Sequence, residues 1–330
     1  MQNAECRRQN AEALFCILPS AFCILKRAPN FPRRGDNSPL NPRKPTDFRR
    51  LCVVEERHTA CPLPGMDRRV VMCAVDLGPL TRRVLFHAAG MAKAMDADLK
   101  VVHVAADASA SAHEQVLTAC LEQAPYEVSL EPDNIAIRTG RVSEMIHREA
   151  RHEHAALLVI GARGHGGLAR LLLGSTSGAV LQNATTPVLL VPPNDLDIVS
   201  IGDRTTLRCG PILAAVDLET KCDRQLRMAS EMAALASQEL LLLTVAKSRT
   251  TDHTAAQQLR ERAHGLEPVK PRAMIVRRGD VAEEIVRCAE TEGAGLVVMG
   301  LEAPPRGRPG VIASAVLKSG RAFVLAVPGC

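Results

Sequence analysis

The sequence predicts an α/β protein with two tandem, Rossmann-like domains, each built on a five-stranded parallel sheet. From residue 67 onward, short apolar runs alternate with longer amphipathic runs, a pattern typical of parallel strands connected by helices. The pattern also occurs twice. VVMCAVDLG at 70–78 is similar to PILAAVDLE at 211–219, and ALLVIG at 156–161 is similar to GLVVMG at 295–300. Because corresponding positions lie 139 to 141 residues apart, the two halves are duplicates in register.

The first half contains five short apolar runs and four longer amphipathic segments. Short runs rich in Val, Ile and Leu are typical of buried strands, and a helical repeat of apolar residues is typical of crossover helices. We expect strands at 70–76, 99–105, 134–138, 156–161 and 187–192. We expect helices near 80–96, 111–123, 142–153 and 175–184. In the second half, Gly279 corresponds to Gly140, and Asp280 with Glu283 predicts a capping box for the third helix.

Composition supports two globular domains and argues against two classes of function. The 330 residues are 46% apolar but only 2% aromatic, so the cores consist mainly of aliphatic side chains. Residues 1–66 hold 11 Lys and Arg against 6 Asp and Glu, and the remainder holds 30 of each. A neutral body with few aromatic residues argues against nucleic-acid binding. No run reaches about 18 apolar residues, so we expect no membrane span.

The segment at 1–66 differs in character from the rest of the chain. It is rich in Arg, Pro, Asn and Cys and lacks periodicity, so we expect it to be disordered or a non-native N-terminal extension. We hypothesise that Met66 is the natural initiator, which N-terminal sequencing of the native protein would test. The expected boundaries are 67–194 for the first domain, 195–209 for a linker and 210–330 for the second domain. No C-x-x-C pair occurs among the early cysteines, and this favours a reducing cytoplasm.

A glycine-rich stretch, GARGHGGLARLLLGST at 161–176, directly follows the fourth expected strand. In open parallel sheets, ligands bind beyond the carboxyl ends of the strands, and both this stretch and Asp76 lie at such ends. Glycine lets the backbone approach a ligand closely. The run GSTS at 174–177 then opens a helix, whose unpaired amides, dipole and neighbouring hydroxyls predict a phosphate site.

These residues resemble the universal stress protein family, whose nucleotide-binding members carry the same glycine spacing. Gly161, Gly164, Gly174 and Ser175 match that motif position by position, and GLARLLLGSTSGAVLQNATTPVLLVP continues the similarity. The resemblance covers residues 67–330. It implies a 3-2-1-4-5 strand order and ATP or a related adenine nucleotide as ligand, with or without Mg²⁺. It also implies a homodimer or an intrachain domain pairing through the fifth strands.

The resemblance and the loop together give the candidate cofactor-binding residues. Asp76 corresponds to an acidic residue near adenine and ribose, and Val104 to a position that lines the adenine pocket. For both, an ordinary role as turn cap or core residue stays open. Arg163 can offset phosphate charge and His165 lies beside the expected phosphate, with surface exposure as the alternative. The full set is Asp76, Val104, Gly161, Arg163, Gly164, His165, Gly174, Ser175, Thr176 and Ser177.

The second half departs from this motif. After Gly300 the chain reads LEAPP at 301–305, so the second glycine is lost, and Gly310 is followed by Val311 instead of serine. Proline removes backbone donors, and the glutamate in this run would repel a phosphate. Asp217 is retained. We predict that the second half binds nucleotide poorly or not at all and serves as a packing partner.

The favoured function is a cytoplasmic, adenine-nucleotide-binding protein of the stress response, whose ligand biases conformation or partner choice. The sequence shows no evident general base or carboxylate pair for a metal, so we expect at most slow ATP hydrolysis. One alternative is a non-binding interaction or scaffold protein of the same fold, and another is a slow ATPase. A third is an adenylate-forming or sulfur-transferring enzyme. Such enzymes usually carry a Ser-Gly-Gly-rich loop after the first strand, where this chain has DLGPL at 76–80.

Other motifs are weaker. The run 164–169 matches G-x-G-x-x-A but follows the fourth strand, and no lysine follows Gly174 as a P-loop requires. The sequence GSTSG has threonine where a nucleophile elbow needs serine. His147, His152 and His154 lack the H-E-x-x-H spacing, so we expect a solvated helix face and no metal site.

Overall fold

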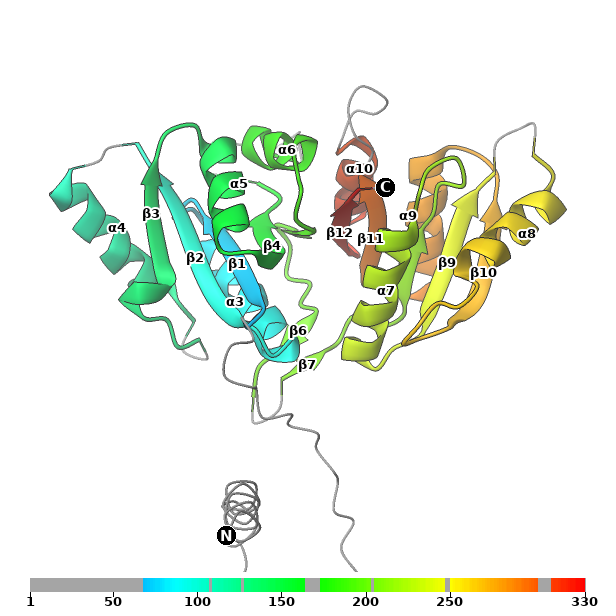
Figure 1. Ribbon diagram of the computed structural model, residues 1–330, viewed down its shortest axis with the longest axis horizontal. Coiled ribbons are helices and arrows are strands. Elements are labelled where there is room, and N and C mark those ends of the chain that lie inside the picture. Colours follow the sequence, from blue (N-terminus) through cyan, green and yellow to red (C-terminus); the bar gives the residue numbers. More distant parts are fainter. Residues whose placement is uncertain are drawn as a thin grey trace, which may run out of the picture. The chain divides into compact units, whose positions relative to one another are not determined.

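The computed structural model describes residues 68–106, 109–125, 128–163, 173–202, 205–246, 250–301 and 310–329 (Figure 1). The expectations for residues 1–66 lie outside this described part. Strands of the first half are β1 (Val70–Val75), β2 (Asp98–Ala105), β3 (Ile135–Thr139), β4 (Ala155–Gly161) and β5 (Val188–Val191). Its helices are α3 (Thr81–Ala94), α4 (Ala110–Gln123), α5 (Val142–His152) and α6 (Ser175–Gln182), with a short 3₁₀ turn, η1 (Pro132–Asn134). All the elements expected in the first half are present, with ends that agree with the prediction or differ from it by at most two residues.

The second half repeats this order. Its strands are β8 (Ile212–Ala215), β9 (Leu240–Val245), β10 (Pro271–Arg277), β11 (Leu296–Leu301) and β12 (Phe323–Pro328). Its helices are α7 (Asp223–Ala236), α8 (Asp252–Ala263), α9 (Val281–Glu292) and α10 (Val311–Ser319). Corresponding turns also adopt the same conformation, because Gly140 and Gly279 have φ angles of 130° and 137°. Residues other than glycine rarely adopt such φ angles, which explains why glycine occurs at both positions. At α9, Asp280 Oδ1 accepts a hydrogen bond from the Glu283 amide at 3.0 Å, which is one of the two bonds of the predicted capping box.

All ten of these strands belong to one sheet, in the order β10-β9-β8-β11-β12-β5-β4-β1-β2-β3. Each half therefore has the expected 3-2-1-4-5 order, with parallel pairing inside it. The halves meet through their fifth strands, which pair antiparallel with Val324 opposite Leu190 and Ala326 opposite Val188. This seam is the intrachain form of the expected pairing.

Two apolar layers cover the two faces of the sheet. Alternate residues of β1 point to opposite layers: Val71 and Cys73 pack with the α3 side, and Met72 packs with the α5 and α6 side. In the second half, α7 and α8 contribute to the first layer, and α9 and α10 to the second. The helix that follows β1 and the helix that follows β4 therefore lie on opposite faces, which leaves a crevice between these two strand ends.

The linker at 195–209 is itself structured. It forms a two-stranded antiparallel hairpin, β6 (Val199–Ser200) with β7 (Thr206–Leu207). Val199 is buried against α3, where a Cβ atom on Gly90 would overlap the Val199 side chain. Glycine in the middle of a helix normally destabilises it, so its presence here reflects this close approach.

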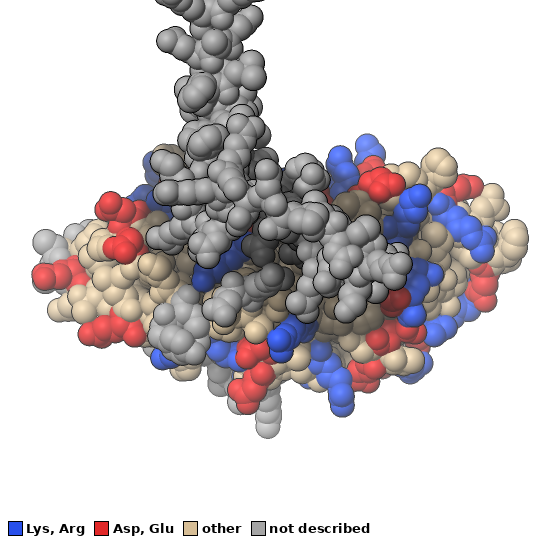
Figure 2. Space-filling view, turned by 90° about the horizontal axis from the view of Figure 1, so that it is seen from below, with Lys and Arg blue, Asp and Glu red and all other residues tan. Residues whose placement is uncertain are grey.

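Acidic and basic side chains are interspersed on the face of the molecule that Figure 2 presents, where that face is not covered by grey atoms. Among the described helices, none is long and apolar enough to cross a membrane.

Candidate functional site

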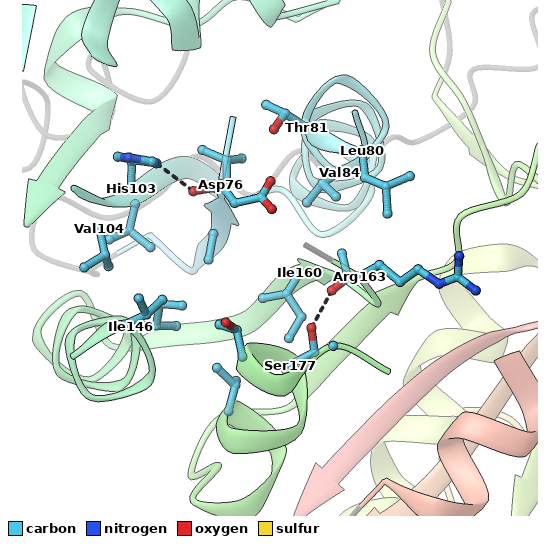
Figure 3. Close-up of a pocket in the computed structure, with 18 of the residues that line it drawn as sticks. Asp76, Leu80, Thr81, Val84, His103, Val104, Ile146, Ile160, Arg163 and Ser177 are labelled. Atoms are coloured by element: carbon cyan, nitrogen blue, oxygen red, sulfur yellow. Dashed lines mark hydrogen bonds between the residues drawn. The ribbon is translucent and has the colours of Figure 1, made fainter. Parts of the chain in front are cut away.

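A cavity of about 550 Å³ opens where β1 and β4 end (Figure 3). Eight of the ten candidate residues line it: Asp76, Val104, Gly161, Arg163, Gly174, Ser175, Thr176 and Ser177. The other two, Gly164 and His165, lie outside the described residues. Residues that are up to about 100 positions apart in the sequence are thus brought to one crevice by the strand order.

The amino end of α6 faces this cavity. Gly174 is its N-cap residue and, as a glycine, has no side chain with which to cap the first turn. The Gly174 amide donates to the Ala162 carbonyl at 2.7 Å, which ties the helix start to the end of β4. Ser175 and Thr176 are exposed at the first turn. An uncapped first turn presents amide groups and the positive end of the helix dipole, which together favour an anion.

Two of the motif residues have a structural task that explains their identity. The Ser177 hydroxyl is buried and donates to the Gly161 carbonyl at 2.8 Å, so it anchors α6 instead of facing a ligand as a donor. A Cβ atom on Gly161 would lie 3.0 Å from the Arg163 carbonyl oxygen, which is too close for the backbone to accommodate easily. Close approach therefore explains this glycine.

Asp76 both lines the cavity and caps the turn that follows β1. Its side chain lines the cavity, and its Oδ1 atom accepts a hydrogen bond from the Gly78 amide at 2.9 Å. The corresponding Asp217 accepts from the Glu219 amide at the same distance. The turn-capping role is thus common to the two halves, whereas the cavity is described for the first half.

The remaining walls of the cavity are largely apolar. Besides the candidate residues, the lining includes Leu80 and Val84 of the first crossover, Val102 of β2, Val142 and Ile146 of α5, Ile160 of β4, and Val180 of α6. An apolar slot with a few polar groups suits an aromatic base attached to a polar group. Sequence patterns did not single out these residues, because each also reads as an ordinary core position on a helix or strand.

Two polar side chains at the cavity point elsewhere. His103 bonds through Nδ1 to the Val75 carbonyl at 2.9 Å, which joins β2 to β1. The Arg163 side chain extends away from Asp76 in Figure 3. Its Nε atom is buried and lacks a hydrogen-bond partner among the described residues.

The second half has a polar side chain in the corresponding place. Gln225 on α7 stands 141 residues after Val84, the same offset that relates Asp217 to Asp76. Gln225 is 1% exposed, and its amide nitrogen donates to the carbonyls of Ala215 at 2.7 Å and Val298 at 3.0 Å. It therefore joins the end of β8 to the middle of β11, and the equivalent residue of the first half, Val84, belongs to the apolar wall of the cavity.

Of the three clustered histidines, two differ from the sequence expectation. His154 lies beyond the end of α5, which is His152. His147 is buried and does not lie on a solvated face. Burial, and next the charge of Arg151, hold its pKa below the ordinary value. The helix turns His147 inward because it lies on the apolar side of α5 beside Ile146 and Ala150.

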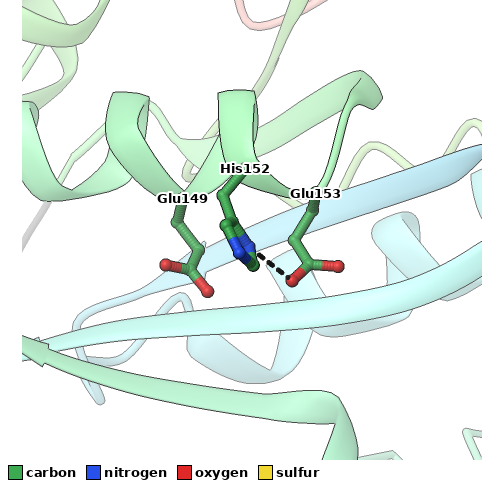
Figure 4. Close-up of side chains that lie close together, drawn as sticks. All are labelled: Glu149, His152 and Glu153. Carbon is green, nitrogen blue, oxygen red and sulfur yellow. Dashed lines mark hydrogen bonds and ion pairs between the residues drawn. The ribbon is translucent and has the colours of Figure 1, made fainter.

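Three side chains near the end of α5, Glu149, His152 and Glu153, lie close enough together to hold a metal ion (Figure 4). Glu149, however, already forms a two-pronged ion pair with Arg138, with distances of 2.8 and 2.7 Å. His152 Nδ1 lies 3.1 Å from Glu153 Oε1. A guanidinium on one carboxylate neutralises the charge that would attract a cation.

A 3-2-1-4-5 parallel sheet with a cavity and an uncapped helix at its central crevice defines the class of Rossmann-like, ligand-binding α/β proteins. The family model of the universal stress protein family matches residues 67–192. Universal stress protein YxiE of Bacillus subtilis is 31% identical over 143 residues, which cover 37% of this chain and 97% of that protein. The chain belongs to the universal stress protein family.

Further comparisons agree with this assignment. Universal stress protein A homolog 1 of Coxiella burnetii is 29% identical over 141 residues, or 38% of this chain and 97% of that protein. A universal stress protein of Mycolicibacterium smegmatis is 51% identical over 41 residues, but the match spans only 14% of its length. The crystal structure of a universal stress protein from Archaeoglobus fulgidus is 20% identical with a TM-score of 0.55, over 78% of this chain and 98% of that chain. The similarity of fold therefore extends over both halves.

Proposed function

We propose that the first half, residues 67–194, binds ATP or a related adenine nucleotide in the cavity between β1 and β4. The observation that carries this proposal is the convergence of an uncapped α6 amino end, the Asp76 carboxylate and an apolar slot on one cavity. The phosphates would bind at Gly174–Thr176, and adenine would lie against Val104. This arrangement separates the negative phosphates from the Asp76 carboxylate.

The proposed nucleotide binding requires only a modest binding free energy. Each backbone or hydroxyl donor to an anion contributes roughly 1.5–3 kcal/mol. Micromolar affinity corresponds to about 8 kcal/mol, so three or four such contacts together with burial of the base suffice. Asp76 is the only carboxylate among the described lining residues, so the cavity provides no carboxylate pair for a metal-assisted hydrolysis. We therefore propose that the protein binds the nucleotide, with or without Mg²⁺, and hydrolyses ATP slowly at most. We propose the cytoplasm as its location.

A residue of the cavity in the first half lies close to the second half, so ligand binding there can affect how the two halves pack. Leu173 lines the cavity, and a Cβ atom on Gly310, the N-cap of α10, would lie 2.5 Å from Leu173 Cδ2. The two halves also pair directly through β5 and β12. A ligand that repositions Leu173 would therefore bias the packing of the two halves, which is how we propose that the protein regulates partners in the stress response.

The full-length chain is expected to bind one adenine nucleotide per chain with micromolar affinity, and to release little or no phosphate from ATP. Isothermal titration with ATP, ADP, AMP and GTP measures affinity and preference, and native mass spectrometry measures the stoichiometry. GTP serves as the control for base recognition. If no adenine nucleotide binds at millimolar concentration, the protein is a non-binding interaction or scaffold protein of this fold. Two nucleotides per chain would show that the second half, residues 210–330, is also a binding domain.

Substitutions at Val84 and at the equivalent Gln225 test whether the glutamine explains why we propose that the second half does not bind nucleotide. Val84→Gln is expected to lower ATP affinity by about tenfold or more, because an amide there can bridge the carbonyls of Ala74 and Val159 and fill the slot. Gln225→Leu, the matched control, is expected to leave ATP affinity unchanged and to destabilise the fold by about 1–3 kcal/mol, since the buried Val298 carbonyl and the partly buried Ala215 carbonyl each lose a hydrogen bond. Titration calorimetry and urea unfolding measure the two effects. Unchanged affinity in Val84→Gln would contradict this assignment.

A further inference from the structure

Thr81, the first residue of α3, has a hydroxyl that no other described residue of the chain binds. The residue is 1% exposed and lines the cavity. Its Oγ1 atom is buried and has no hydrogen-bond partner in the part of the chain that the structure describes. Figure 3 shows the hydroxyl on the side of α3 that faces Asp76. A buried, unpaired hydroxyl destabilises a fold, so its presence beside a cavity calls for a partner in that cavity.

The neighbouring groups are already engaged with one another. The Gly78 amide donates to Asp76, and the Gly78 carbonyl accepts from the Thr81 amide at 3.0 Å. Arg83, on the next turn, donates to the Leu196 carbonyl at 2.6 Å and pairs with Asp197 at 3.1 Å. These bonds do not include the Thr81 hydroxyl, and the buried Arg83 Nε atom also has no hydrogen-bond partner among the described residues.

The second half provides an internal comparison. Cys222 stands 141 residues after Thr81 and is also fully buried. Its sulfur, unlike the Thr81 oxygen, accepts a hydrogen bond from Arg262 at 3.2 Å. In the second half the side chain at this position is therefore hydrogen-bonded to another residue of the chain. In the first half, which has the cavity, the equivalent Thr81 hydroxyl has no partner among the described residues.

We propose that Thr81 is a specificity-determining residue that binds a sugar hydroxyl of the nucleotide, together with Asp76. This inference rests on the proposed nucleotide site. The Asp76 carboxylate repels phosphate, so the phosphates occupy the α6 side and the neutral ribose is the part of the ligand left for the Asp76 side. A carboxylate only accepts hydrogen bonds, whereas a threonine hydroxyl both donates and accepts. The pair therefore suits two adjacent hydroxyls, which is the 2′,3′-diol of a ribonucleotide.

The test compares Thr81→Val, which has the same shape without the hydroxyl, with Thr81→Ser, which keeps it. Titrations use ATP, 2′-deoxy-ATP and 3′-deoxy-ATP with the full-length chain. The wild-type protein is expected to bind ATP about tenfold more tightly than at least one deoxy analogue, and Thr81→Val is expected to lose both this factor and this discrimination. Thr81→Ser should retain both. The Tm of ligand-free Thr81→Val should equal or exceed that of the wild type, because an unpaired buried hydroxyl is removed.

Each other outcome has one meaning. If the wild type and Thr81→Val bind ATP equally, the inference about Thr81 is wrong and the proposed function stands. If Thr81→Val weakens all three nucleotides equally, or lowers the Tm of the ligand-free protein, the residue has a structural role and the sugar assignment is overturned. If the wild type binds none of the three nucleotides, the proposed function itself fails.

Discussion

Replacing Gly174 with glutamate is expected to lower ATP affinity by about 100-fold or more while leaving the free energy of unfolding nearly unchanged. Gly174 has φ −67° and ψ 158°, which any L residue adopts, so the substitution introduces no backbone strain. The new carboxylate would stand at the amino end of α6, in the place proposed for phosphate. It would repel the ligand and itself interact favourably with the helix dipole. Titration calorimetry and urea unfolding measure the two quantities.

Two control substitutions separate charge from bulk. Gly174→Ala adds only a methyl group and is expected to keep most of the affinity. Gly174→Gln has nearly the size of glutamate without its charge, and should bind more tightly than Gly174→Glu. Wild-type affinity in Gly174→Glu would place the phosphates elsewhere in the cavity and would remove the main support for the proposed site.

Acidification from pH 7 to pH 4 is expected to lower the free energy of unfolding by about 3 kcal/mol through His87 alone. His87 is fully buried on α3, with Nδ1 2.8 Å from the Arg83 carbonyl and its ring 4.7 Å from that of Phe323 in β12. Burial, as the main cause, lowers its pKa from 6.5 to about 4; the charge of Arg83 acts in the same direction, and Asp197 opposes it. Between pH 6.5 and 4, His87 therefore binds a proton in the unfolded chain but stays neutral in the folded chain. The free energy of unfolding accordingly decreases as the pH falls through this range.

Urea unfolding at several pH values between 7.5 and 4 measures this dependence, with His87→Leu as the comparison. The substitution is expected to flatten the curve by the contribution of His87, whatever its effect on absolute stability. A smaller slope should persist, because His147 is also buried with a lowered pKa. Identical slopes in the two proteins would show that His87 does not titrate as a buried neutral side chain. The result bears on both halves, since His87 and Phe323 pack together across them.

The candidate site was predictable from sequence to the extent that it depends on local signals. Gly174 precedes a run of small hydroxyl residues, and the helix begins at Ser175 as expected. Asp76 and Gly161 end the apolar runs that form β1 and β4, and strand ends share one edge of a parallel sheet. Thr81 and Gln225 carried no such signal, because a single polar residue on a helix reveals neither its burial nor its partners. His147 was misjudged for the same reason.

The local elements and their duplication could be predicted from the amino-acid order, since apolar periodicity and turn glycines such as Gly140 and Gly279 act over a few residues. The way the halves join came from long-range packing, which set β5 antiparallel to β12 and placed the linker hairpin on Gly90 of α3. It also decided what occupies the equivalent place in each half, because Val84 lines the cavity of the first half and Gln225 joins β8 to β11 in the second. These outcomes depend on which distant groups satisfy one another's hydrogen bonds and fill one another's space, and no local pattern encodes them.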